Sequence, residues 1–224
     1  MSARVMLITG GFGGLGTRLG ALAADAGYKV ALVGRSRAQD TGFPALRLEG
    51  IDTGRPEEAR KAVDLVVEQL GGLDVLVNAT GDFTIGSVQD GNVEDWARLY
   101  AANVVPAVAA SQAAIPALVA SGSGRIVNVG AALGGQGAPF VGAASASKSA
   151  LARMTEAAAA ELAESGVTVN IVLPTIIDSP RNRQMMPDAD PADWVSYEQV
   201  AGAILSLAAP EAGDRTGQAI PIGF

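Results

Sequence analysis

Short apolar runs alternate with longer amphipathic runs along the whole chain. The short runs are rich in Val, Ile and Leu and have the length of buried strands. They predict strands at Val5–Thr9, Lys29–Val33, Ala45–Leu48, Val75–Asn78, Arg125–Val129, Thr168–Leu173 and Gln218–Ile222. The longer runs predict helices at Leu15–Ala26, Pro56–Leu70, Val93–Ala120, Gly142–Ser165 and Glu198–Ala208. This alternation predicts an α/β fold, a doubly wound parallel sheet of about seven strands with helices on both faces.

One domain accounts for residues 1–224. No repeat, linker or shift in composition divides the chain, and doubly wound sheets often exceed the usual domain size. The least regular part lies at about 178–195, where three prolines accompany many polar residues. We expect this part to be a mobile loop or lid.

Composition narrows the possible partners. The net charge of −7 argues against nucleic acid or an anionic membrane as the main partner. We expect no apolar run of membrane-spanning length, and Met1–Arg4 leads directly into a strand without a visible signal peptide. A cytoplasmic location is therefore expected.

The chain contains no Cys and no His. Disulfides and thiol nucleophiles are thereby excluded, and the commonest general base and metal ligand is lacking. We expect no metal site. Any chemistry must use Lys, Asp, Glu, Tyr, Ser or Asn.

A glycine-rich turn follows the first predicted strand and opens the first helix. Glycine permits the tight turn and the close approach of a ligand, and the helix N-terminus directs N–H groups toward a diphosphate. A glycine pattern alone is weak evidence, but its place after a strand near the start of the chain favours dinucleotide binding. The residues expected to contact the nucleotide are Gly10, Phe12, Gly13, Gly14, Leu15 and Gly16.

The second strand ends in Arg35, Ser36 and Arg37, with no acidic residue at its tip. An Asp or Glu there would bind both ribose hydroxyls and repel a 2′-phosphate, whereas arginines can grip that phosphate. We therefore predict NADP(H) rather than NAD(H). The alternative is that Arg35 and Arg37 are solvated loop charges.

Taken together, these features resemble the short-chain dehydrogenase/reductase family over nearly the full length, which implies a Rossmann fold. The order and spacing of the matching residues carry the resemblance. Asp52 falls where the family contacts adenine, Asn103 where an asparagine holds a relay water, and Lys148 at the lysine of Tyr-x-x-x-Lys. Further matches imply cofactor contacts, with Thr80 a departure, at Asn78, Ala79, Thr80, Gly81, Pro174, Ile176 and Ile177.

A narrower likeness covers Leu173–Arg183 and continues to Trp194. It resembles the dihydropteridine-reductase-like branch of the family, which tolerates a missing catalytic serine. The resemblance implies a small-molecule substrate without fixing which one.

Two family hydroxyls are missing. The tyrosine that protonates the substrate oxygen maps to Ala144, and the serine that steadies the oxyanion maps to Ala131. Losing a positioned acid usually costs about 10² to 10⁴ in rate, and an oxyanion donor about 10² to 10³ more. An easily reduced imine-like or quinonoid centre would tolerate this loss better than an ordinary carbonyl.

Few residues can replace the tyrosine. Lys148 is one candidate acid, and Asp82, directly after the Asn78–Gly81 turn, is another, although a solvated loop charge is at least as good an interpretation of Asp82. Tyr100 and Tyr197 are weaker candidates for the acid. Helix packing is the better interpretation of Tyr100, and Tyr197 adjoins the predicted loop and would have to swing into the site. On the shared helix face of Ala144 and Lys148 we expect a void the size of a phenol ring.

We favour an NADP(H)-dependent oxidoreductase acting on a small carbonyl, imine-like or quinonoid substrate. Three alternatives stay open: a non-catalytic nucleotide-binding protein, a non-redox enzyme such as a cyclase, dehydratase or isomerase, and an engineered Tyr-to-Ala form. The family pairs its subunits through helices that correspond to Val93–Ala120 and Gly142–Ser165, so a homodimer or homotetramer is expected.

Overall fold

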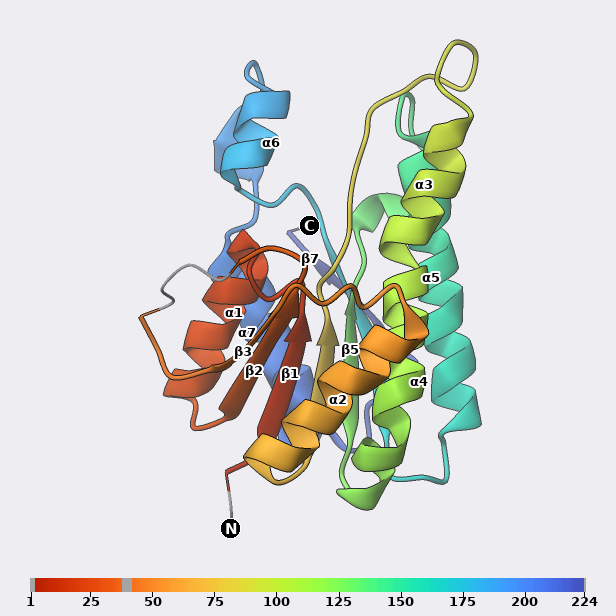
Figure 1. The fold of residues 1–224 in the computed structure, drawn as a ribbon. Coiled ribbons are helices and arrows are strands. Elements are labelled where there is room, and N and C mark those ends of the chain that lie inside the picture. Colours follow the sequence, from red (N-terminus) through yellow and green to blue (C-terminus); the bar gives the residue numbers. More distant parts are fainter. Residues whose placement is uncertain (1–2, 38–41, 224) are drawn as a thin grey trace.

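A single α/β domain forms around a parallel seven-stranded sheet with the order β3-β2-β1-β4-β5-β6-β7 (Figure 1). The structure is a computed structural model and describes residues 3–37 and 42–223. Met1 and Ser2, part of the stretch in which no signal peptide is expected, lie outside the described residues. The strands are β1 (Val5–Thr9), β2 (Lys29–Gly34), β3 (Leu46–Glu49), β4 (Val75–Asn78), β5 (Arg125–Val129), β6 (Thr168–Pro174) and β7 (Ala219–Ile222).

Helices cover both faces of the sheet, as the alternating pattern predicts. Successive residues of a strand point to opposite faces: in β1, Val5 and Leu7 join one apolar cluster while Met6 and Ile8 join the other. The longer helices are α1 (Gly14–Asp25), α2 (Pro56–Leu70), α3 (Glu94–Asn103), α4 (Val105–Ala120), α5 (Gly142–Glu161) and α7 (Tyr197–Ala208). Helices α1 and α7 pack on one face, and α2, α4 and α5 pack on the other.

The predicted helix at 93–120 is two helices in the structure. Helix α3 ends at Asn103 and α4 begins at Val105, so the two abut with Val104 between them. Pro106 has no N–H group and leaves the carbonyl of Ala102 without its usual helical donor. The break was missed because the apolar pattern runs through it unchanged. The predicted helix at 142–165 also ends early, at Glu161.

The expectation that no run reaches membrane-spanning length is wrong for α3 and α4. By length and composition alone, the stretch Glu94–Ala120 could cross a membrane. However, 56% of its most apolar 18 residues are buried inside the structure, where α4 packs against α2. Such burial is typical of a core helix.

The segment predicted as an irregular loop at 178–195 contains regular structure. Helix α6 (Pro180–Met185) begins after Ser179, whose hydroxyl accepts a hydrogen bond from the Asn182 N–H at 3.1 Å. The two ends of the segment are joined, because the Asp178 N–H donates to the Val195 carbonyl at 2.8 Å. The segment rises beside the carboxyl ends of the strands (Figure 1). Its mobility stays a prediction.

Candidate active site

The order of strands reverses between β1 and β4, so the connections leave in opposite directions there. In doubly wound sheets a ligand binds in the crevice at this point, beyond the carboxyl ends of the strands. A cavity of about 320 Å³ lies there and joins the turns after β1, β2 and β4. It is lined by Gly10, Phe12, Gly13, Gly34, Arg35, Ser36, Ile51, Asp52, Thr53, Ala79, Thr80 and Gly81.

Gly10 brings the two central turns together. It has a φ of +65°, in the left-handed region that favours glycine. A Cβ atom at Gly10 would lie only 2.9 Å from the carbonyl oxygen of Ala79. Because the turns touch at this residue, the glycine loop and the start of the loop after β4 form one continuous wall.

At the end of β2, the cavity wall contains one of the two predicted arginines. Arg35 and Ser36 line it, whereas Arg37 is exposed and does not. Asp52 lines the cavity, and its Oδ1 accepts a hydrogen bond from the Gly54 N–H at 3.0 Å. The cavity is also lined by Gly34, Ile51 and Thr53, which the sequence analysis did not predict. They could have been found because they are sequence neighbours of the predicted residues Arg35 and Asp52.

Several predicted cofactor residues lie outside this cavity. Asn78 is buried in the core, where its Nδ2 donates to Asn128 Oδ1 at 2.9 Å and to Ser111 Oγ at 3.2 Å. This side chain joins β4 to β5 and α4, so its position suits a structural role. The other residues absent from the cavity wall are Gly14, Leu15, Gly16, Lys148, Pro174, Ile176 and Ile177.

The side chains of Lys148 and Asn103 both lie next to Gly81, at the end of the turn after β4. A Cβ atom at Gly81 would lie 2.8 Å from Asn103 Oδ1 and 3.2 Å from Lys148 Nζ. The Lys148 ammonium donates to the Val129 carbonyl at 3.1 Å. The residue as a whole keeps some exposure, but burial of its charged end lowers the pKa of Lys148 to about 8. An amine with such a pKa can give or take a proton near neutral pH.

The side chain of Asn103 is fully engaged by protein groups. Its Oδ1 accepts from the Asp82 N–H at 2.7 Å, and its Nδ2 donates to the Asp82 carbonyl at 3.0 Å. Nδ2 also donates to Ser147 Oγ at 2.8 Å, a contact that the sequence did not suggest. Asn103 therefore fixes the loop after β4 against α5.

Ala144 and Lys148 lie one turn apart on α5, but the expected void beside Ala144 is absent. Ala144 is only 1% exposed, so a space the size of a phenol ring does not adjoin its Cβ atom. The expected void is absent because neighbouring groups pack against the small side chain of Ala144. Ala131 is the second residue after the end of β5 and keeps partial exposure.

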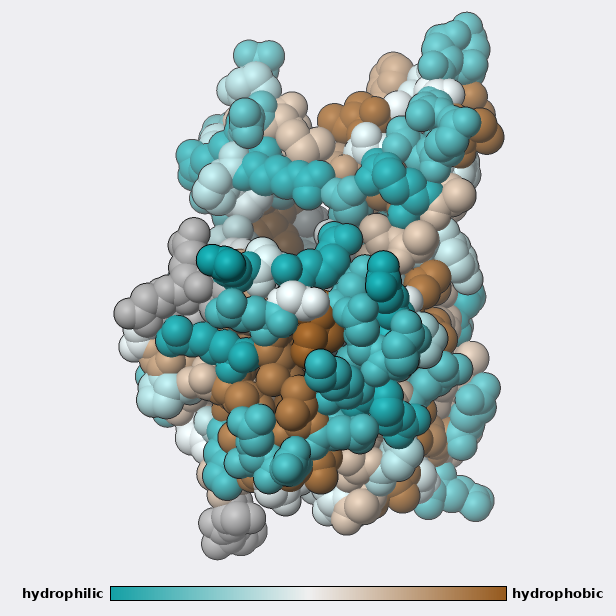
Figure 2. Space-filling view, in the orientation of Figure 1, coloured by the Kyte–Doolittle hydropathy of each residue, from teal (hydrophilic) through white to brown (hydrophobic). Residues whose placement is uncertain are grey.

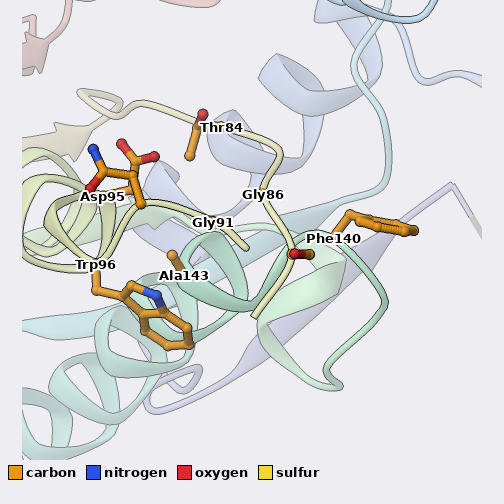
Figure 3. Close-up of a pocket in the computed structure, with 9 residues that line it drawn as sticks. Thr84, Gly86, Gly91, Asp95, Trp96, Phe140 and Ala143 are labelled. Atoms are coloured by element: carbon orange, nitrogen blue, oxygen red, sulfur yellow. The ribbon is translucent and has the colours of Figure 1, made fainter. Parts of the chain in front are cut away.

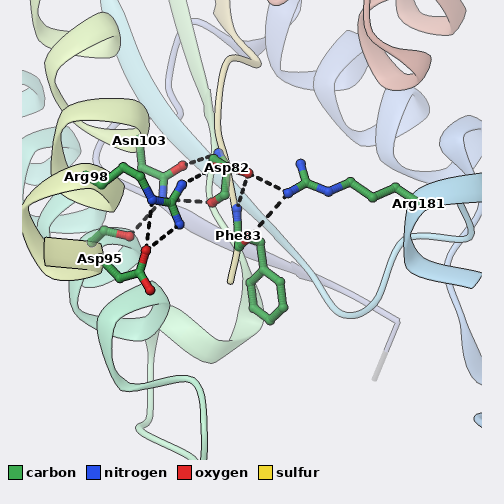
Figure 4. Close-up of polar contacts among 7 residues, drawn as sticks. Asp82, Phe83, Asp95, Arg98, Asn103 and Arg181 are labelled. Carbon is green, nitrogen blue, oxygen red and sulfur yellow. Dashed lines mark hydrogen bonds and ion pairs between the residues drawn. The ribbon is translucent and has the colours of Figure 1, made fainter. Parts of the chain in front are cut away.

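Asp82 is held by two arginines, as Figure 4 shows. Its carboxylate pairs with Arg98 of α3 and, at 2.6 Å, with Arg181 of α6. Burial raises the pKa of Asp82, but hydrogen bonds from Arg181, the Phe83 N–H and Arg98 outweigh it and hold the pKa below its ordinary value. A carboxylate with these partners stays ionised at neutral pH, which argues against the proton-donor role considered for it.

A second, shallower hollow lies between the start of α3 and the start of α5 (Figure 3). Trp96 and Ala143 line it from these two helices, and Phe140 borders it. Phe140 has a φ of +65°, a strained backbone for an aromatic residue, and its carbonyl accepts from the Gly86 N–H at 2.7 Å. No pattern of residues around Phe140 indicated this strain.

Comparisons with known proteins agree with this architecture. The profile described as short chain dehydrogenase matches residues 4–190. The D-beta-hydroxybutyrate dehydrogenase of Rhizobium meliloti is 29% identical, and the alignment covers 92% of this chain and 84% of that protein. The 2,5-dichloro-2,5-cyclohexadiene-1,4-diol dehydrogenase LinX of Sphingobium indicum is 31% identical, with 99% and 95% covered.

Solved structures show the same relationship. A short-chain type dehydrogenase/reductase from Mycobacterium ulcerans superposes with a TM-score of 0.90 at 26% identity, covering 99% of this chain and 90% of that one. An NAD+-bound xylitol dehydrogenase has a TM-score of 0.88 at 25% identity, covering 99% and 98%. The chain belongs to the short-chain dehydrogenase/reductase family, whose members use a nicotinamide cofactor. Its relatives are dehydrogenases, which supports an oxidoreductase.

The ion pair between Asp82 and Arg181 should hold α6 against the loop after β4. In Asp82→Asn we expect trypsin to cleave after Arg181 or Arg183 about threefold to tenfold faster, because a partly exposed pair contributes about 1 kcal/mol. Asp95→Asn is the control, since Asp95 pairs with Arg98 on α3. Equal cleavage rates in the two variants would show that the pair does not restrain α6.

Proposed function

We propose that this protein is an NADP(H)-dependent oxidoreductase that reduces a small carbonyl, imine-like or quinonoid substrate, with Lys148 as its proton donor. The position of Lys148 carries the proposal. Its amine lies where the turns after β4 and β5 converge, and its pKa of about 8 suits proton transfer near neutral pH.

The lining of the cavity supports binding of the adenosine end of a nicotinamide nucleotide. Glycine at position 10 lets the turns after β1 and β4 touch, and the cavity leads from Arg35 and Ser36 toward Gly81, beside which Lys148 lies. When bound, the cofactor supplies or accepts the hydride. The protein residues orient it: Arg35 pairs with a 2′-phosphate, and Asp52 contacts the adenine.

The proton would come from the Lys148 ammonium. One of its three donors is used by the Val129 carbonyl, which leaves two for a ribose hydroxyl and the substrate heteroatom. The alanines at 131 and 144 offer no hydroxyl, so we propose a substrate centre that needs little protonation in the transition state. The likeness of Leu173–Arg183 to the dihydropteridine-reductase-like branch supports such a substrate. A form inactivated by loss of the tyrosine, or a non-redox enzyme on the same scaffold, is the competing proposal.

Cofactor choice follows from Arg35. We expect NADPH to bind ~10-fold or more tightly than NADH, because a charge-assisted phosphate contact contributes roughly 1.5–3 kcal/mol. Arg35→Ala should remove most of this preference, while Arg153→Ala, which loses the same charge on exposed α5 surface, should keep it. Fluorescence titration measures both. Equal affinities that Arg35→Ala leaves unchanged would contradict the assignment.

Proton donation by Lys148 predicts a pH profile. The amine must be protonated to act, so kcat/KM for reduction should be level below pH about 8 and fall above it. Lys148→Arg keeps the positive charge but does not titrate in this range. It should lower the rate and abolish the break near pH 8. A break that persists in this variant would assign the titration to another group.

Ala144→Tyr distinguishes the competing proposals. In a form inactivated by loss of the tyrosine, a tyrosine at 144 should raise reduction of ordinary carbonyls by about 10², the usual size of a general-acid contribution. Because Ala144 is buried, the ring must displace its neighbours and should also lower stability by about 1–3 kcal/mol. Ala146→Tyr adds the same ring at an exposed site of α5 and should do neither. With altered chemistry at this site, Ala144→Tyr should instead block the native substrate and give no gain on ordinary carbonyls.

We also propose self-association, as a homodimer or homotetramer. Val88, Val93, Trp96 and Tyr100 expose apolar side chains along and before α3. Figure 2 shows apolar surface near the upper end of that helix. Burying such a patch between subunits is favourable. Light scattering at micromolar concentration should give at least twice the monomer mass. A monomer would contradict this proposal.

A further inference from the structure

Tyr197 occupies a defined position at the first residue of α7. A capping box fixes the start of this helix: Ser196 Oγ accepts from the Gln199 N–H at 3.1 Å, and Gln199 Oε1 accepts from the Ser196 N–H at 2.8 Å. Glu198, the next residue, pairs with Arg18 of α1 at 2.8 Å. These contacts hold the start of α7 against α1.

The phenol of Tyr197 reaches the glycine motif. A Cβ atom at Gly14 would lie 2.2 Å from Tyr197 Oη and 2.6 Å from its Cζ. A larger residue at position 14 would therefore force the phenol of Tyr197 to move. The sequence suggested neither contact, because 183 positions separate residues 14 and 197 (197 − 14).

Tyr197 does not line the cavity, but its hydroxyl lies beside Gly14, next to the predicted diphosphate site. Gly14 is the first residue of α1 and stays exposed, and Gly13 before it lines the cavity. N–H groups in the first helical turn have no partner within the helix and attract an anion. Tyr197 thus adds a side-chain hydroxyl beside these N–H groups.

The surroundings of Tyr197 keep its hydroxyl protonated. Burial raises the pKa of Tyr197, and the nearby Asp178 carboxylate acts in the same direction, against a hydrogen bond with the Ser179 side chain. Ser179 also caps α6. A protonated phenol that is already oriented by α7 and Ser179 is suited to donate to an anion.

We propose that Tyr197 is a further cofactor-binding residue, whose hydroxyl donates a hydrogen bond to the diphosphate of the nicotinamide nucleotide at the start of α1. This rests on the nucleotide binding proposed above. Through Ser179, the same residue connects the bound diphosphate to α6. The opposite arrangement, in which the hydroxyl excludes the diphosphate, predicts the opposite effect of removing it.

Removing the hydroxyl tests the proposal. Tyr197→Phe should raise the Kd for NADPH by about tenfold, the effect of losing one hydrogen bond to a charged group. Tyr28→Phe is the matched control, because its hydroxyl bonds the Ala208 carbonyl at 3.3 Å, away from the cavity. It should change the Kd by less than about twofold. Thermal unfolding of both variants checks that each is folded.

A truncated ligand locates the effect. Adenosine 2′-monophosphate carries the phosphate expected near Arg35 but no diphosphate, so Tyr197→Phe should bind it as the unmodified protein does. An unchanged or lower Kd for NADPH in Tyr197→Phe, or an equal loss with both ligands, would overturn the proposal. If the unmodified protein bound neither NADPH nor NADH, the proposed function would fail as well. If the unmodified protein bound NADPH and Tyr197→Phe left that affinity unaltered, only the inference about Tyr197 would fail.

Discussion

The close approach of two backbone turns at the centre of the sheet is the constraint on which the rest of this site depends. Gly10 touches the Ala79 carbonyl because it has no side chain, and its left-handed φ turns the chain away from β1 in time to begin α1. A larger residue would separate the turns and open the wall of the cavity. The turns after β1 and β4 are thereby held together as one wall of the cavity.

Polar contacts fix the loop after β4 in place. The Asn103 side chain forms hydrogen bonds with both the N–H and the carbonyl of Asp82, and the Asp82 carboxylate joins α3 to α6 through Arg98 and Arg181. Figure 2 shows the surface hollowed between the α6 segment and the upper end of α3. Loss of one charge at Asp82 would therefore affect both walls of this hollow.

Two alanines underlie the proposed chemistry. The resemblance places a tyrosine and a serine of the family where Ala144 and Ala131 stand, so we propose that Lys148 supplies the proton. Burial suits this role, because it lowers the pKa of the amine to about 8. Ala144 is itself buried, so a larger side chain there would have to displace its neighbours.

Local patterns in the sequence were enough to predict the fold and the place of the glycine turn. Alternating apolar strands and amphipathic helices are local patterns, and the glycine turn follows its strand directly, so no long-range information was needed. Strands β1, β4 and β5 and helix α2 have the predicted bounds. Only the tertiary structure decided the partners of Asp82, the burial of Ala144 and the contact of Tyr197 with Gly14. These depend on how distant segments pack: Asp82 and Arg181 are 99 positions apart, and no local periodicity encodes their meeting.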